Sequence, residues 1–187
     1  MDTLNCIKTR RSIRRFTDQP ISDETLQQLL EAVRWAPSWA NSQCWRLIVV
    51  KDPEIKNSLS NLLSPHNPAT KGVQQAPIVI VLCAQLGISG YTMEKGRAGR
   101  KDDWFMFDLG IAAQNLCLAA HALGLGTVHV GSIKHEEVDQ LLGLPEGVVA
   151  VEIIPVGYPA KVGNPPPRKD ITEFVFQDRY GQSLTLG

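Results

Sequence analysis

The segment from Asp102 to about residue 123 is the feature that most constrains the fold of this 187-residue chain. We expect a helix here, because the acidic pair Asp102-Asp103 favours a helix start and Gly124 supplies a stop. Its apolar side chains fall on every side of the helix: Phe105, Phe107, Leu109, Ile111, Ala112, Leu116 and Leu118. A helix with this pattern is buried centrally, and a short chain can cover it with a second subunit. We therefore expect a homodimer.

The rest of the chain mixes strand and helix patterns, which predicts one α+β domain over residues 1–187 with a central mixed β-sheet flanked by helices. The expected strands cover residues 46–50, 77–83, 127–131 and 148–156. The expected helices cover residues 2–15, the segment between Ser22 and Pro37, a segment from Asp52, and residues 135–142. The continuously apolar run 77–83 is typical of a strand buried on both faces. Residues 87–101 are glycine-rich and aperiodic, which is typical of a disordered or functional loop, such as a lid.

Composition excludes several classes of protein. A formal net charge of zero and a pI near 6.9 argue against a general nucleic-acid binder. No apolar run is long enough to span a membrane, and the polar, basic N-terminus has no signal segment, so we expect a cytoplasmic protein. The four cysteines show no CxxC spacing and the four histidines no HExxH pattern, so we expect neither a disulfide framework nor a metal site.

A basic cluster near the N-terminus is the strongest chemical signal. Four arginines and one serine lie within residues 10–15 of an otherwise neutral chain. Arginine presents a rigid fork of donors that suits phosphate, and a hydroxyl between the arginines adds a neutral donor. The alternative is a solvated helix face, because charge runs usually are solvated. The phosphate interpretation predicts a pocket for one anionic group, such as the phosphate of a cofactor.

Other nucleotide and catalytic motifs do not fit. Gly124-Leu125-Gly126 follows an expected helix and precedes an expected strand, whereas the dinucleotide fingerprint requires the reverse order. The chain contains no GxxxxGK[ST] and no GxSxG. We therefore predict no side chain that acts as catalyst by itself, and we expect a cofactor to carry the chemistry.

Six motifs in order resemble the nitroreductase-like flavoprotein family. They are R-R-S-x-R-x-F from residue 10, A-P-S-x-x-N-x-Q-x-W from 36, D-x-G-x-A-x-Q-N-L from 108, L-G-L-G-T from 123, V-G-Y-P-A from 156 and P-R-K from 167. The resemblance covers nearly the whole chain. It implies FMN held non-covalently at the interface of an intertwined homodimer.

The same resemblance implies which residues bind FMN. The phosphate and the polar edge of the ring would be held by Arg10, Arg11, Ser12 and Arg14, with a second phosphate clamp from Arg168 and Lys169. A turn from the partner subunit would reach the flavin through Pro37, Ser38, Trp39, Asn41 and Gln43. The ring would lie along Val130, Gly131 and Ser132, and Asn67 is a looser match to a ring contact. Two departures stand out: Cys44 replaces the usual proline of the turn, and Gly131-Ser132 replaces Gly-Gly or Glu-Gly.

The function implied is hydride transfer from NAD(P)H through FMN to a nitroaromatic, a quinone or a similar electron-poor acceptor. Three alternatives stay open at this point. The protein could be a flavoenzyme of the same fold with another reaction, such as dehalogenation or flavin cleavage. It could be a flavin-binding module without turnover, or a cofactor-free protein whose arginines bind another phosphate.

Overall fold

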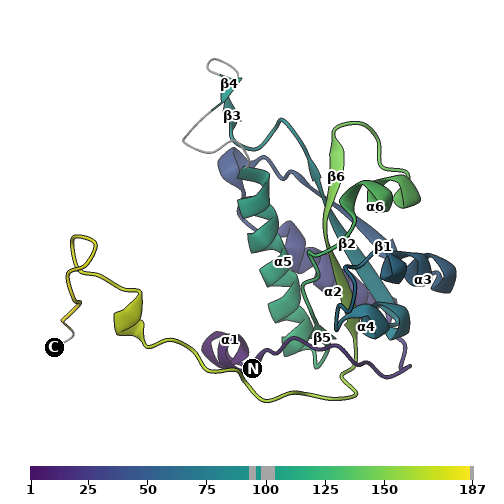
Figure 1. The fold of residues 1–187 in the computed structure, drawn as a ribbon, viewed down its shortest axis with the longest axis horizontal. Coiled ribbons are helices and arrows are strands. Elements are labelled where there is room, and N and C mark those ends of the chain that lie inside the picture. The colour runs from purple at the N-terminus through teal and green to yellow at the C-terminus, as the bar shows by residue number, and fades with distance from the viewer. Residues whose placement is uncertain (93–95, 98–103, 186–187) are drawn as a thin grey trace.

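The computed structural model describes residues 1–92, 96–97 and 104–185, arranged as one sheet with helices on both faces (Figure 1). The helices are α1 (Thr3–Thr9), α2 (Asp23–Arg34), α3 (Pro53–Asn61), α4 (Thr70–Gln75), α5 (Trp104–Ala122) and α6 (His135–Leu142). None of these described helices combines the length and hydropathy needed to cross a bilayer.

The main sheet has four strands, in the order β1 (Trp45–Val50), β2 (Ile78–Gln85), β6 (Val148–Gly157) and β5 (Gly126–Thr127). Each neighbouring pair is antiparallel. Helices α3 and α4 connect β1 to β2, so that β2 runs back along β1. The α+β class is confirmed. The mixed character expected from the sequence is limited, in the described residues, to a parallel bridge between Ser12 and Thr127.

Strand β2 separates two apolar cores, because successive side chains of a strand point to opposite faces. Ile80 and Leu82 pack into the core that holds α2 and α5. Val79 and Val81 pack into the core that holds α3, α4 and α6. All four side chains are fully buried, so the expectation of a strand covered on both faces is confirmed.

Helix α5 is buried on one side only within the single chain. Leu109 and Leu116 are almost fully buried against the sheet, whereas Met106 and Phe107 are 52% and 61% exposed. Gly124, with φ +80°, ends the helix as expected, and the Leu125 N–H donates to the Ala120 carbonyl at 2.8 Å. The expected start at Asp102-Asp103 lies outside the described residues. The apolar face that the chain leaves open is the face for which the sequence predicts a second subunit.

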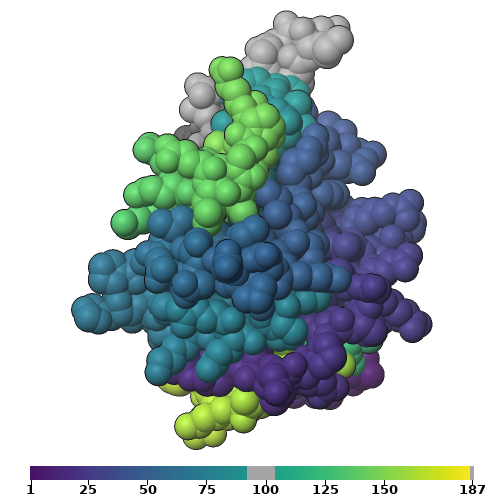
Figure 2. Space-filling view, turned by 90° about the vertical axis from the view of Figure 1, so that its right-hand side faces the viewer, coloured from purple at the N-terminus to yellow at the C-terminus, as the bar shows by residue number. Residues whose placement is uncertain are grey.

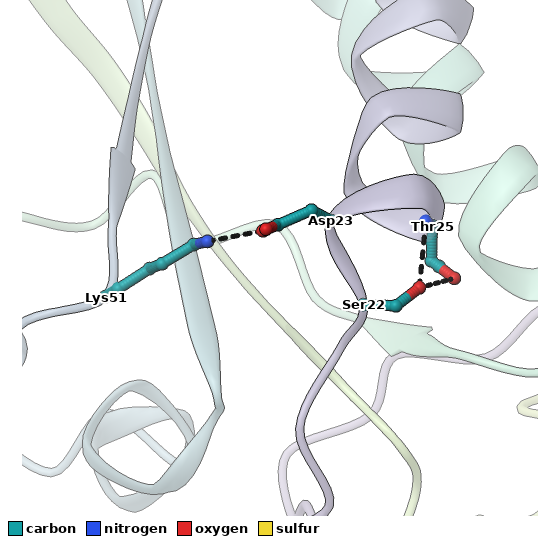
Figure 3. Close-up of polar contacts among 4 residues, drawn as sticks. All are labelled: Ser22, Asp23, Thr25 and Lys51. Carbon is teal, nitrogen blue, oxygen red and sulfur yellow. Dashed lines mark hydrogen bonds and ion pairs between the residues drawn. The ribbon is translucent and has the colours of Figure 1, made fainter.

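Helix α2 shows how local chemistry sets a boundary (Figure 3). The Ser22 side chain caps the helix by accepting from the Thr25 N–H at 3.1 Å, as its sequence position predicts. Lys51, directly after β1, donates to the Asp23 carboxylate at 2.9 Å, and this contact lowers the pKa of Asp23. Because both side chains are exposed, we assign the pair a minor role in stability.

The N-terminal expectation was partly wrong. A helix was expected over residues 2–15, but α1 ends at Thr9 and the arginines follow in extended backbone. The extended path is fixed because the Ile13 N–H donates to the Thr127 carbonyl at 2.8 Å. Ile13 and Phe16 are buried, whereas Arg14 and Arg15 between them are exposed and Arg10 and Arg11 are half-buried.

Two further segments differ from a plain loop or strand. Residues Tyr91–Thr92 (β3) and Gly96–Arg97 (β4) form a small antiparallel hairpin inside the expected loop 87–101, and the rest of that loop from 93–95 and 98–101 lies outside the described residues. The C-terminal tail leaves the sheet after β6 and runs away from the body (Figure 1). Its short 3-10 helix η2 (Ile171–Glu173) precedes an isolated antiparallel bridge between Phe176 and Ser183.

Replacing Gly126 by alanine tests how tightly the arginine segment is held against β5. The added Cβ would lie 2.5 Å from Ile13 Cγ1, and Ile13 is a buried, β-branched side chain. We expect Gly126→Ala to lower the free energy of unfolding by about 1–3 kcal/mol, the usual cost of overpacking, in urea denaturation. Gly163→Ala is the control, because its added Cβ meets nothing within 4 Å. Equal stability of Gly126→Ala and wild type would contradict this close packing.

Candidate functional site

A cationic cavity joins the two ends of the chain. It has a volume of about 190 Å³ and is lined by Arg10, Arg11, Ser12, Arg14, Gly163, Asn164, Pro166 and Arg168. In Figure 2 the yellow C-terminal segment lies against the purple N-terminal atoms at the lower edge of the molecule. The sequence-predicted arginines are thus brought together across about 150 residues, but Lys169 does not line the cavity.

The charge of this cavity is incompletely compensated. None of its lining residues is acidic, and Arg10 Nη1 is buried without a hydrogen-bond partner among the described residues. Arg11 Nη1 donates to the carbonyls of Lys8 and Arg10, at 2.7 and 2.8 Å. A buried guanidinium nitrogen without an acceptor is costly unless a ligand supplies one. An anion with several oxygens, such as the phosphate of FMN, fits this donor set.

The turn at residues 37–43 is held in strained backbone. It contains the short 3-10 helix η1 (Trp39–Asn41), and Ala40, Asn41 and Gln43 have φ values of 45°, 56° and 47°. Left-handed backbone at a non-glycine residue costs on the order of 1–3 kcal/mol and is retained where the surroundings enforce it. Inside the turn, the Gln43 N–H donates to Ser38 Oγ at 3.0 Å, and the Gln43 amide donates to Asn41 Oδ1 at 3.3 Å.

Asp108 on α5 holds this turn through hydrogen bonds. Its carboxylate is 1% exposed and accepts from the Trp39 N–H at 3.0 Å and from Ser42 Oγ at 3.2 Å. It also accepts from Ser89 Oγ at 2.6 Å and from Cys44 Sγ at 3.6 Å. Sequence reasoning placed Asp108 in a motif without giving it a role. A carboxylate inside an apolar helix was the available signal, because such a group needs several donors around it.

Cys44 is part of the core. It is fully buried, and burial, followed by the charge and the hydrogen bond of Asp108, raises the pKa of its thiol to about 11. The thiol is therefore neutral near pH 7 and unsuited to act as a nucleophile. This environment favours Cys44 as a packing substitute for the usual proline.

The predicted ring-contacting strand lies beside the loop of Asn67. Val130 is buried and pairs with Ile153, while Gly131 and Ser132 are exposed. The Ser64 N–H donates to the Ser132 carbonyl at 3.0 Å, which places the loop before α4 next to Ser132. Asn67 itself accepts from the Ala69 N–H at 3.0 Å.

In one chain the turn of residues 37–43 and the arginine segment lie toward opposite ends of α5. Thr9 Oγ1 lies 2.8 Å from His121 Nε2, and burial, followed by the charges of Arg10 and Arg11, lowers the pKa of His121. The turn instead contacts Asp108. Asp108 and His121 are 13 positions apart on the α-helix, about 20 Å at 1.5 Å per residue. The turn and the cationic cavity therefore do not meet within a single chain.

A larger cavity of about 670 Å³ lies between α5, α6 and β6, and Gly131 lines it together with His129 and Glu152. His129 was not singled out from the sequence. Its Nδ1 lies 2.9 Å from Glu152 Oε2, and its Nε2 lies 3.4 Å from Cys117 Sγ. These contacts, first with Cys117 and then with Glu152, raise the pKa of His129 to about 10. No sequence pattern could have found this group, because the three residues meet only through strand register and helix packing.

The chain is similar in sequence and in fold to known proteins. Residues 7–158 match the family model described as the nitroreductase family. An FMN reductase (NAD(P)H) of Bacillus subtilis is 32% identical over 177 residues, covering 89% of this chain and 70% of the relative. An NADH dehydrogenase of Thermus thermophilus is 31% identical and covers 94% of this chain and 95% of the relative. The NADPH:FMN oxidoreductase from Vibrio harveyi, solved in complex with NAD+, superposes with a TM-score of 0.83 at 32% identity, over 98% of this chain and 79% of that one.

The pKa of His129 predicts a pH-dependent stability. The folded pKa of His129 is about 10, above the ordinary 6.5, so protonated His129 stabilises the folded state. This contribution to the free energy of unfolding is complete below pH 6.5 and is lost as the pH rises toward 10. We expect the midpoint of urea unfolding to fall over this interval in the wild type. The fall should be smaller in His129→Gln. A His129 ring that titrates near 6.5 by NMR would contradict the assigned contacts.

Proposed function

Because the chain belongs to the nitroreductase family, we propose that it is an FMN-dependent oxidoreductase that uses NAD(P)H. The observation that carries the proposal is the cavity of Arg10, Arg11, Ser12, Arg14 and Arg168, with its buried and unpartnered Arg10 nitrogen. The phosphate of FMN, with a charge of roughly −1.5 to −2 if it behaves like other phosphate monoesters, supplies the acceptor oxygens that this donor set lacks.

The chain's own residues bind and orient in this proposal. Arg10 and Arg168 clamp the phosphate from the two ends of the chain, and Ser12 adds a hydroxyl donor. Lys169, which lies outside the cavity lining, contributes positive potential rather than a direct contact. Val130, Gly131 and Ser132 form the strand end along which the ring lies. The chemistry that FMN supplies when bound is two-electron transfer between NAD(P)H and an electron-poor acceptor, for which we propose nitroaromatics or quinones.

We propose that two chains build each site. Within one chain the turn of Pro37, Ser38, Trp39, Asn41 and Gln43 contacts α5 at Asp108, whereas the segment that leads to the arginines contacts it at His121, about 20 Å further along the helix axis. A second copy can bring its own turn to the flavin. Two surfaces support a homodimer: the exposed apolar face of α5, and the tail that leaves the body after β6 (Figure 1). The cavity also unites residues 10–14 with 163–168, which supports treating residues 1–187 as one unit.

The deciding experiment is absorbance spectroscopy of the purified protein. We expect a yellow protein that releases FMN on denaturation, is bleached by anaerobic NADH or NADPH, and recovers its colour with menadione. A protein that takes up no flavin on reconstitution would sink the proposal. Bound flavin that NAD(P)H does not bleach would indicate a binding module, and bleaching without recovery would indicate flavin cleavage.

Arginine substitutions test the phosphate clamp. We expect Arg10→Ala and Arg168→Ala each to weaken FMN binding by roughly ten- to hundredfold, the value of a charge-assisted hydrogen bond. Riboflavin lacks the phosphate, so its affinity should change little. Isothermal titration of both flavins measures this contrast. Arg15→Ala is the matched control, because Arg15 is an exposed arginine of the same segment that does not line the cationic cavity. Equal losses for FMN and riboflavin would assign Arg10 to the fold or the ring.

Substitution on the open face of α5 tests the dimer. Phe107 is 61% exposed in the single chain, and we expect Phe107→Asp to convert a dimer into a monomer and to release the flavin. Ile55→Asp on α3, across the sheet from α5, is the control and should leave the dimer intact. Light scattering at low micromolar concentration gives the mass. A wild-type protein that is a stable, flavin-loaded monomer would disprove the two-chain site.

A further inference from the structure

Asp108 is a buried carboxylate that connects three separate segments. It sits on α5, and its oxygens accept from the turn through Trp39 and Ser42 and from the segment before β3 through Ser89. The Ser89 hydroxyl is itself 2% exposed, and its 2.6 Å contact is the shortest of the set. All four of the donors described above are neutral. Cys44 and Ser89 are buried and need an acceptor inside the protein, whereas Trp39 and Ser42 are half-buried.

The contact with the Trp39 N–H has a particular consequence. A backbone N–H cannot rotate away to find another acceptor, unlike a serine hydroxyl. Oδ1 of Asp108 therefore fixes the position of the peptide at the start of η1, and Oδ2 fixes Ser42 at its end. The left-handed residues Ala40 and Asn41 lie between these two fixed points. The carboxylate thus enforces a backbone shape that the residues of the turn do not favour by themselves.

We propose that Asp108 is the positioning residue that holds the turn of residues 37–43 in the shape needed to contact the flavin of a partner subunit. This inference rests on the proposed function, since it gives the turn a flavin to contact. Asp108 acts on the flavin through Ser38, Asn41 and Gln43 and does not touch it. Its role is therefore separate from that of the arginines, which act on the phosphate of the flavin bound to their own chain.

The first test compares two flavins. Asp108→Ala removes the acceptors from the turn, so we expect FMN and riboflavin to bind more weakly by the same factor, roughly ten- to hundredfold. Arg10→Ala should instead affect FMN more than riboflavin. Ser60→Ala is the control, because Ser60 on α3 is about as buried as Asp108 and donates to the Asn57 carbonyl. This substitution should leave both flavin affinities unchanged. Should Asp108→Ala fail to fold, Ser42→Ala replaces it, with about a tenfold equal loss for both flavins.

The second test asks whether Asp108 serves the partner's site, which a merely structural role would not require. Arg10→Ala and Asp108→Ala subunits carrying different tags are co-expressed, and FMN is added at a concentration that neither parent binds. In a mixed dimer, one site combines the intact arginines of one chain with the intact turn of the other. Random pairing then predicts flavin in about one quarter of all sites. Ser42→Ala replaces Asp108→Ala in this mixture where needed.

The outcomes distinguish a failure of the proposed function from a failure of the role assigned to Asp108. A wild-type protein that takes up no FMN overturns the proposed function, and this inference with it. A wild type that binds FMN, beside a folded Asp108→Ala that binds both flavins equally well, overturns the role of Asp108 alone. Mixed dimers that bind no more FMN than their parents also overturn it, because Asp108 would then serve its own chain.

Discussion

The packing of α5 against one face of the sheet is the contact on which the rest of the structure depends. Its buried side carries small and branched residues that meet the alternate side chains of β2, and both ends of the helix hold functional groups. Asp108 lies near the first turns and His121 near the last. The helix therefore sets the distance between the turn, which contacts it at Asp108, and the segment of the arginines, which contacts it at His121.

The cationic cavity shows how the fold keeps like charges close together. Arg10, Arg11 and Arg14 follow one another on extended backbone that is fixed by the pairing of Ile13 with Thr127. The hydrogen bond belongs to the backbone and the burial to Ile13 and Phe16, so the guanidinium groups contribute little to holding the segment in place. Their mutual repulsion is then relieved when an anion binds, which makes the same arrangement both a cost to the empty protein and a source of affinity.

Much of the fold could be predicted from the sequence, since it follows from local patterns. The apolar run in β2, the Ser22 cap and the Gly124 stop each depend on a few neighbouring residues, and each was found in the structure. The boundary of α1 could not be predicted, because Arg10–Arg15 are good helix formers and only the distant strand β5 draws them into extended backbone. The Asp108 contacts and the His129 group also escaped, since they join segments far apart in the chain. The family resemblance supplied the candidate site residues, while only the structure places the turn and the arginines toward opposite ends of α5 within one chain.

The two walls of the cationic cavity are held with different firmness, because one of them is the tail after β6. Arg168 lies on a segment that is exposed along residues 161–174 and belongs to neither of the two apolar cores, whereas Arg14 directly follows Ile13, which is buried in one of them. In the single chain this exposed tail is open to proteases, and cleavage there would remove one wall of the cavity without unfolding the sheet. Assembly with a second copy that covers the tail would then protect the protein from proteolysis as well as complete its site.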